Sequence, residues 1–225
     1  MTASDNEITA NLAEIKATIP SHVTLVAVSK THPSEAIEVA YRAGHRVFGE
    51  NKVQEMEVKA TILANDIQWH LIGHLQSNKV KYIAPFVTLI HAVDSEKLLE
   101  EIQKRAAANK RIIDVLLQVH IATEETKFGF DAAELNEFLA SKRWTNLPNV
   151  RLRGLMGMAT YTNDEGQVRN EFRGLKAIFD ASKILLGDDF DTLSMGMSGD
   201  YQIAIEEGST MVRIGSSIFG AREYH

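Results

Sequence analysis

The chain has 225 residues, of which 44% are hydrophobic and 24% charged, and its formal net charge is −6 at pH 7. This length and composition allow one folded domain with a substantial core, which we expect to span residues 1–225. The negative charge argues against a general nucleic-acid-binding protein. The absence of cysteine excludes disulfides, thiolate metal sites and a cysteine nucleophile.

The first predicted element is an amphipathic helix over residues 8–19, in which apolar residues recur on one stripe. Charged residues such as Asp5 and Lys16 interrupt the apolar positions, so the segment lacks the apolar core of a secretory signal peptide. No later run approaches the roughly 20 apolar residues that a membrane-spanning helix requires. Together with the lack of cysteine, this favours a cytoplasmic protein that does not enter membranes.

Strand-like and helix-like segments then alternate along the rest of the chain. The predicted strands cover residues 23–29, 47–49, 68–72, 87–92, 112–119, 152–158, 192–195 and 211–214. The predicted helices cover residues 34–43, 52–64, 78–84, 95–108, 131–141, 165–186 and 201–206. Such a series predicts the α/β class and a closed parallel (β/α)8 barrel of the TIM type with an extra N-terminal helix. The rival architecture is an open doubly wound sheet.

Lys30 directly follows the first predicted strand, at the strand end where βα barrels carry their active sites. An amine that is partly withdrawn from water loses hydration, its pKa falls, and the neutral form can attack an aldehyde to form a Schiff base. The alternative is a lysine that simply extends its ammonium group into solvent. This residue alone does not separate the two interpretations.

Two turns rich in glycine and serine, at residues 194–200 and 213–217, follow the seventh and eighth predicted strands. Glycine lets backbone N–H groups approach a phosphate closely, and serine adds a hydroxyl group. Turns at these places form a recurring phosphate site in barrels, although most glycine-serine turns merely reverse the chain. Barrel closure would bring Lys30 next to Arg213 and Gly215, so the sequence predicts one pocket for a phosphorylated aldehyde.

Five blocks occur in order along nearly the whole chain: residues 28–33, 48–55, 69–79, 152–156, and 194–198 together with 213–220. In these blocks the chain resembles the pyridoxal phosphate homeostasis protein family, also called YggS/PROSC-like. The resemblance implies a fold like the barrel domain of alanine racemase. It also implies a protein that binds pyridoxal 5′-phosphate (PLP), carries and buffers it, and takes part in vitamin B6 and amino-acid homeostasis without established catalytic turnover.

The resemblance also assigns roles to individual residues. Lys30 would form the internal aldimine with PLP, and Arg213 would face the pyridine nitrogen. The phosphate would be held by the N–H and hydroxyl groups of Ser198, Gly199, Gly215 and Ser216. Ser216 stands where many family members have threonine, and it retains the hydroxyl group. Asn51 either contacts the ring oxygen of PLP or N-caps the helix predicted to begin at Lys52.

An arginine at the pyridine nitrogen bears on whether the chain is an enzyme. A carboxylate there would keep the nitrogen protonated and make the ring a strong electron sink, whereas arginine only donates hydrogen bonds. Racemases add a second base, a tyrosine from a further domain, and we expect no such domain in a chain that ends at His225. Tyr161 or Tyr201 could replace that tyrosine only within hydrogen-bond reach of a substrate.

We therefore expect a non-catalytic carrier with no catalytic residues. The alternatives are a PLP-dependent amino-acid racemase-type enzyme and a Schiff-base aldolase on a similar barrel, which would hold no such chromophore. The expected partners are PLP itself and PLP-dependent apoenzymes as transient acceptors, with no nucleic acid and no membrane. We expect a monomer, because the racemase dimer uses the domain that is absent here.

The remaining polar residues have simpler interpretations. His70 lies in an apolar strand and is expected to be a hydrogen-bonded core histidine, whereas His74 faces either the pocket or solvent. The eight histidines show no spacing typical of a metal site. Glu50, Glu55 and Lys79 are expected to be solvated charges or salt-bridge partners. Lys79 could alternatively offer a transient docking point for PLP.

Overall fold

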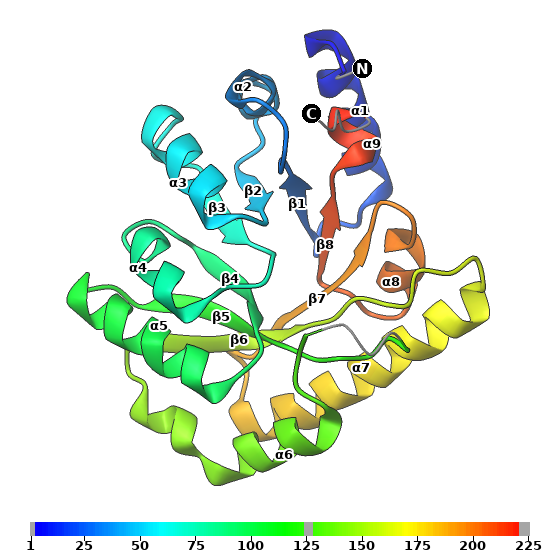
Figure 1. Ribbon diagram of the computed structural model, residues 1–225. Helices are drawn as coiled ribbons and strands as arrows, with labels where there is room; N and C mark the ends of the chain where they lie inside the picture. Colours follow the sequence, from blue (N-terminus) through cyan, green and yellow to red (C-terminus); the bar gives the residue numbers. More distant parts are fainter. Residues whose placement is uncertain (1–2, 124–127, 221–225) are drawn as a thin grey trace.

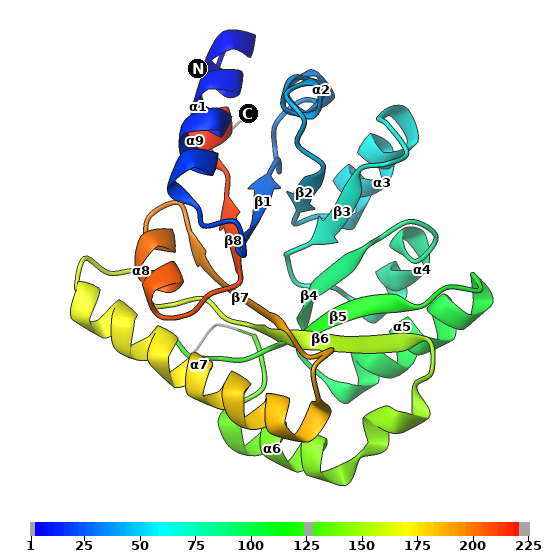
Figure 2. The ribbon, with the colours of Figure 1, turned by 180° about the vertical axis from the view of Figure 1, so that it is seen from behind.

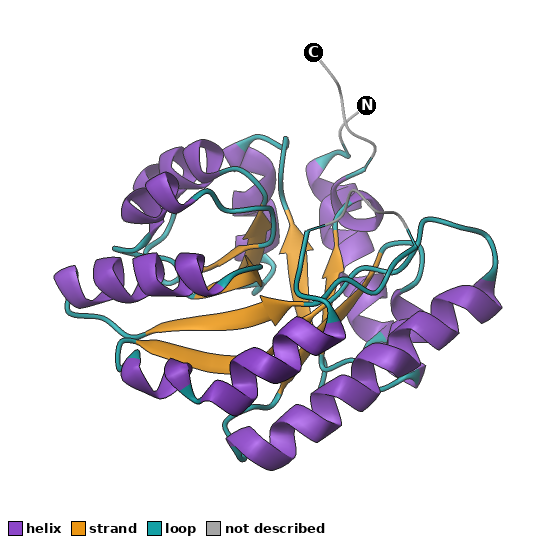
Figure 3. Ribbon diagram, turned by 60° about the horizontal axis from the view of Figure 1, so that its bottom comes forward, coloured by secondary structure: helices purple, strands orange, loops and turns teal. Residues whose placement is uncertain are grey.

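A computed structural model describes residues 3–123 and 128–220. Parallel strands close into a barrel in the order β1-β2-β3-β4-β5-β6-β7-β8, with the helices around it (Figures 1 and 3). The strands are β1 (Thr24–Val28), β2 (Val47–Glu50), β3 (Gln68–Leu71), β4 (Leu89–Val93), β5 (Ile113–Gln118), β6 (Val150–Met156), β7 (Thr192–Met197) and β8 (Met211–Ile214). The helices are α1 (Asp5–Thr18), α2 (Ser34–Arg42), α3 (Val53–Ile62), α4 (Val80–Ile83), α5 (Glu96–Ala108), α6 (Ala132–Ser141), α7 (Glu165–Leu186), α8 (Tyr201–Glu206) and α9 (Ser216–Phe219), and the 3₁₀ turns are η1 (Ser77–Lys79) and η2 (Arg143–Asn146).

Pairing between the first and last strands closes the barrel. Ala27 of β1 lies opposite Ile214 of β8, and this ladder continues back to Thr24 opposite Met211. The predicted closed barrel is therefore confirmed, and the open sheet is excluded. In the described part of the chain, no helix is both long and apolar enough to cross a membrane.

Apolar side chains fill two layers, one inside the barrel and one between the strands and the helices. The interior layer consists of Val26, Leu89, Ala92, Leu116, Met156 and Met211. Successive side chains of a strand point to opposite faces, so Val28 shares the interior face with Val26. The N–H of Ser29 still donates to the carbonyl of Gly49 at 3.0 Å, which extends the pairing past the end of β1. The same alternation, carried past the end of β1, would put Lys30 on the interior face.

The predicted element bounds agree with the structure to within a few residues at the ends, except that the helix predicted over residues 78–84 is divided into η1 and α4. The helix predicted from Lys52 begins at Val53, with Lys52 at the N-cap position and no side-chain cap. Ser95 does cap α5, accepting a hydrogen bond from the N–H of Leu98 at 3.4 Å. Helix α2 ends before Gly44, whose φ of 84° is left-handed and favours glycine.

Helix α1 packs beside α9, as Figures 1 and 2 both show. The Asn11 Nδ2 donates to the carbonyl of Ile218 at 3.2 Å, and Thr18 Oγ1 lies 3.0 Å from the hydroxyl of Tyr201. The extra N-terminal helix therefore contacts both short helices, α8 and α9, that follow the two glycine-serine turns.

Candidate functional site

Lys30 and the Gly215 turn lie side by side at the carboxyl ends of β1 and β8. The side chain of Lys30 is partly buried, and Gly215 packs against the residue at the end of β1. A Cβ atom on Gly215 would lie 3.0 Å from the carbonyl oxygen of Val28, so glycine favours this close backbone approach. The structure thus brings together two segments that are separated by most of the sequence.

A buried ion cluster, here called the Lys59 cluster, adjoins the Lys30 turn and consists of Ser29, Glu50, Glu55 and Lys59. The Lys59 Nζ donates to Glu50 Oε1 and to Glu55 Oε1, each at 2.7 Å, and to the carbonyl of Ser29 at 2.9 Å. The Ser29 hydroxyl donates to the same Glu50 Oε1 at 2.6 Å. Glu50 is 0% exposed. The prediction of a solvated Glu50 is therefore wrong, and the alternative of a salt-bridge partner is confirmed for both glutamates.

Glu50 and Lys59 form an ion pair that is withdrawn from water. Burial raises the pKa of Glu50, and the nearby ammonium group of Lys59 opposes that rise. Taking both groups out of water is costly, and the cost is offset only when hydrogen bonds satisfy the charges. Lys59 uses all of its N–H groups in this way.

A second buried set, here called the Arg213 chain, crosses the barrel interior through Arg213, Ser194, His91 and His70. Arg213 Nη1 donates to the Ser194 hydroxyl at 2.6 Å and to its carbonyl at 2.9 Å, while Nη2 donates to the carbonyl of Gly157 at 3.0 Å. The Ser194 hydroxyl lies 3.0 Å from His91 Nδ1, and His91 Nε2 lies 3.0 Å from His70 Nδ1. The prediction of a hydrogen-bonded core His70 is confirmed.

The Arg213 chain carries a single positive charge. Burial lowers the pKa of Arg213 to about 10, which still leaves the guanidinium charged at neutral pH. Burial also lowers the pKa of His70 to about 3 and that of His91 well below its usual value, so both imidazoles are neutral. Because arginine only donates, Ser194 Oγ accepts from it and has its own hydrogen left for His91 Nδ1. The guanidinium keeps further N–H groups for a ligand.

Besides the bonds from Arg213 to Ser194, a long hydrogen bond joins the two glycine-serine turns. The Gly215 N–H donates to Ser198 Oγ at 3.3 Å, so a phosphate would replace this contact to reach that N–H. Gly199 and Ser216 are exposed, and a Cβ on Gly199 would have no atom within 4 Å. Helices α8 and α9 are short, so the anion-binding capacity of these turns depends on their N–H and hydroxyl groups more than on helix dipoles.

Asn51 lies after β2, packed against the loop after β3. A Cβ on Gly73 would lie 2.4 Å from the carbonyl oxygen of Asn51, so the two loops touch. The Asn51 Oδ1 is buried and has no hydrogen-bond partner among the described residues. The interpretation of Asn51 as an N-cap is wrong, because α3 begins one residue too late for it. Its unpartnered oxygen is an acceptor that a ring hydroxyl could satisfy.

The two tyrosines considered as second bases lie elsewhere. The Tyr201 side chain turns toward α1, where its hydroxyl meets Thr18. Tyr161 is 98% exposed. His74 is also exposed and pairs with Asp94, its Nδ1 lying 3.1 Å from Asp94 Oδ2. No group of three metal-binding side chains exists among residues 3–123 and 128–220.

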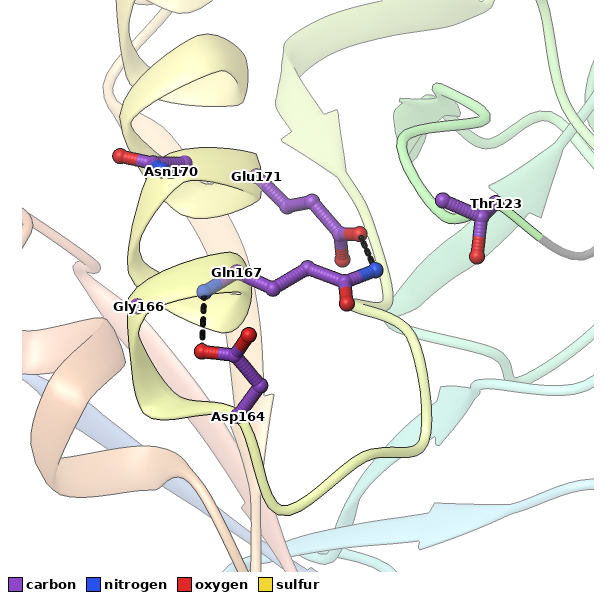
Figure 4. A pocket seen from close by; sticks show the side chains of 6 residues that line it. All are labelled: Thr123, Asp164, Gly166, Gln167, Asn170 and Glu171. Atoms are coloured by element: carbon purple, nitrogen blue, oxygen red, sulfur yellow. Dashed lines mark hydrogen bonds between the residues drawn. The ribbon is translucent and has the colours of Figure 1, made fainter.

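A wide depression opens on the rim near the start of α7 (Figure 4). It is lined by Thr123, Asp164, Gly166, Gln167, Asn170 and Glu171. Two hydrogen bonds link its lining residues: Gln167 Nε2 donates to Glu171 Oε1 at 2.9 Å, and the Gln167 N–H donates to Asp164 Oδ1 at 3.1 Å (Figure 4). None of the predicted site residues lines it, so it is separate from the Lys30 site.

Sequence reasoning missed His91, Ser194 and Lys59. His91 interrupts the apolar strand β4 in the same way that His70 interrupts β3, and this signal could have identified it. Ser194 is the first residue of the first glycine-serine turn, so its hydroxyl is easily assigned to the turn itself. Lys59 carried no signal, because a lysine on a helix usually faces solvent.

Comparisons with known proteins agree with this geometry. The family model described as alanine racemase, N-terminal domain, matches residues 4–223. A pyridoxal phosphate homeostasis protein from Aquifex aeolicus is 44% identical over 201 residues, covering 89% of this chain and 87% of the relative. The structure of PipY from Synechococcus elongatus with PLP bound is 36% identical, with a TM-score of 0.86, and covers 95% of this chain and 100% of that one.

Alanine racemase from Bartonella henselae shares the fold at 17% identity. Its TM-score is 0.74, and the match covers 97% of this chain and 60% of that one. The predicted resemblance to a racemase barrel is thereby confirmed at the level of architecture.

Proposed function

This chain belongs to the pyridoxal phosphate homeostasis protein family, and we propose that it binds PLP at the carboxyl end of its barrel and carries and buffers the cofactor without turning over a substrate. Its identity to relatives of that name, together with a structure of PipY that holds PLP, supports the binding. The observation that carries the proposal is the β1–β8 pairing, which sets Lys30 beside the Gly215 turn.

The residues present fit the chemistry of PLP. The amine of Lys30 would hold the aldehyde carbon covalently, and the N–H and hydroxyl groups of the two turns would hold the phosphate. Those turn residues are Ser198, Gly199, Gly215 and Ser216. Arg213 would donate to the pyridine nitrogen, and the unpartnered oxygen of Asn51 supports a contact with the ring hydroxyl. When bound, PLP supplies an aldehyde that links to amines and a ring that withdraws electrons.

We also propose that the bound cofactor does not catalyse turnover of a substrate. Arg213 is cationic and only donates, so it cannot keep the pyridine nitrogen protonated as a carboxylate would. Tyr201 is engaged with Thr18, and Tyr161 is almost fully exposed, so neither supports a base on the face opposite Lys30. The competing function is a racemase-type enzyme, which the shared fold alone favours.

The proposal extends to how the cofactor moves. A role in PLP homeostasis requires that bound PLP be released again, and we include PLP-dependent apoenzymes as transient acceptors. The whole chain would act as one PLP-binding domain and as a monomer. A cytoplasmic location is consistent with the absence of cysteine.

An absorption spectrum with added PLP tests the binding. The wild-type protein should show the band of a cofactor linked to a lysine amine, and Lys30→Ala should lose it. A wild-type protein without this band would contradict PLP binding at this site. Turnover is tested separately in deuterated water, where the carrier should not exchange the α-hydrogen of common amino acids. Catalytic exchange would favour the racemase-type alternative.

A further inference from the structure

The peptide groups on both sides of Lys30 are anchored to the Lys59 cluster. On one side, the Ser29 carbonyl accepts from Lys59, and the Ser29 hydroxyl donates to Glu50. On the other side, the N–H of Thr31 donates to Glu55 Oε1 at 2.6 Å. Every hydrogen-bond partner of Lys59 therefore either belongs to a residue flanking Lys30 or accepts a hydrogen bond from one.

Thr31 holds a backbone conformation that it would not adopt by itself. Its φ of 67° is left-handed, a region that a β-branched residue rarely occupies. Such a conformation persists only where surrounding contacts determine it. The contact on the Thr31 N–H is Glu55, and Lys59 holds the same carboxylate oxygen at 2.7 Å. Release of this carboxylate would let Thr31 relax and would rotate the peptide that joins it to Lys30.

The position of the cluster also argues for this role. Glu50 and Lys59 lie between the barrel wall and α3, where apolar side chains of similar size could fill the same space. A buried ion pair is a poor source of stability compared with such packing, because both ions lose their hydration. Its hydrogen bonds, however, fix the directions of specific peptide groups, which apolar packing cannot do.

We propose that Lys59 is a positioning residue that, through Glu50, Glu55 and the peptides of Ser29 and Thr31, holds the amine of Lys30 toward the barrel interior. This inference rests on the proposed covalent capture of PLP by Lys30. It adds that capture depends on the orientation of the turn as well as on the presence of an amine. The phosphate turns and Arg213 belong to other strands and do not depend on Lys59.

Comparing the affinities for two ligands distinguishes a positioning role of Lys59 from a role in folding. PLP can link to Lys30, whereas pyridoxamine 5′-phosphate has the same ring and phosphate but an amine in place of the aldehyde, so it binds without that link. Lys59→Met removes the ammonium group and retains an unbranched side chain. We expect the PLP dissociation constant to rise about tenfold or more, since small misplacements of a reacting group have large effects. Affinity for pyridoxamine 5′-phosphate should stay within about twofold of the wild type.

Lys52→Met is the matched control, because Lys52 is an exposed lysine at the start of the same helix. It should leave both affinities unchanged. Glu55→Ala keeps the Lys59–Glu50 pair and removes the acceptor that the Thr31 N–H shares with Lys59, so it tests the inference if Lys59→Met does not fold. It should weaken PLP binding about threefold and spare pyridoxamine 5′-phosphate.

If the folded variants lost affinity for both ligands equally, or lost no affinity for PLP, the positioning role would be overturned. A wild-type protein that takes up no PLP would contradict the proposed function itself. That failure appears before any variant is compared, so the two failures can be told apart.

Discussion

The Lys59 cluster and the Arg213 chain both bury charged side chains at the barrel, but the partners of their charges differ. In the Lys59 cluster one ammonium group contacts an oxygen of each of two carboxylates outside the barrel wall, and Glu50 Oε2 is left buried without a partner among the described residues. In the Arg213 chain one cation inside the barrel donates to neutral acceptors, and no carboxylate of the described residues lies within salt-bridge distance of it. The ammonium group of Lys59 is fully used within its cluster and so can hold backbone, whereas Arg213 has no carboxylate in salt-bridge contact and keeps N–H groups for a ligand.

The largest expected effect on stability comes from removing the one cation of the Lys59 cluster. Lys59→Met should lower the free energy of unfolding by about 3 kcal/mol, because Glu50 would remain buried without its partner. Chemical denaturation measures this loss. The double variant Glu50→Gln with Lys59→Met should recover part of it by removing the unpaired charge. A loss below about 1 kcal/mol in the single variant would mean that the pair is not desolvated as the structure indicates.

Ser194→Ala in the Arg213 chain should have a smaller effect on stability, because it breaks no ion pair. Ser194→Ala removes the hydroxyl that joins Arg213 to His91 and should lower the free energy of unfolding by about 2 kcal/mol. Ser182→Ala is the matched control: Ser182 is equally buried, but its hydroxyl bonds only within α7, to the carbonyl of Ile178. Equal losses in the two variants would show that the chain is not a coupled unit.

The two regions should also affect the pH dependence of stability in opposite directions at acid pH. The pKa of His70 is about 3 in the folded protein, below its usual value near 6.5, so the unfolded state binds the proton first as pH falls. The contribution of neutral His70 to the free energy of unfolding is therefore complete above pH 6.5. It falls by about 1 kcal/mol per pH unit as the pH drops toward 3. Glu50 has the opposite sign, because its raised pKa favours the folded state as pH falls.

A pH series of unfolding measurements on the wild type and His70→Gln tests this sign. The variant should lose stability less steeply between pH 6.5 and pH 4, since one depressed histidine is absent. An unchanged slope would contradict a neutral, buried His70.

The smallest effect concerns the left-handed residue beside Lys30. Thr31→Gly should raise the free energy of unfolding by up to about 1 kcal/mol, because glycine takes a positive φ without strain. Lys142→Gly is a comparison at another left-handed position, φ 54°, far from the site in sequence. A clear loss of stability in Thr31→Gly, with a gain in Lys142→Gly, would show that the threonine side chain contributes more than its backbone strain costs.

The sequence predicted the features that depend on local patterns. Strand and helix periodicity gave the eight units and the closed barrel, and the position of Lys30 after a strand, together with the glycine-serine turns, indicated the candidate site. The two buried polar regions depend on which strand ends meet, and Ser194 lies 103 residues from His91. Local patterns carry no information about such partners. The prediction for Asn51 as a helix cap failed for a smaller reason, a one-residue shift in the start of α3.

The central claim is that the amine of Lys30 and the Gly215 turn bind opposite ends of one PLP molecule. Borohydride reduction of the PLP-loaded protein, followed by peptide mapping with mass spectrometry, tests it most directly. The account predicts that the cofactor's mass is fixed on Lys30. Labelling of another lysine instead, such as Lys79, or no labelled peptide at all, would contradict it.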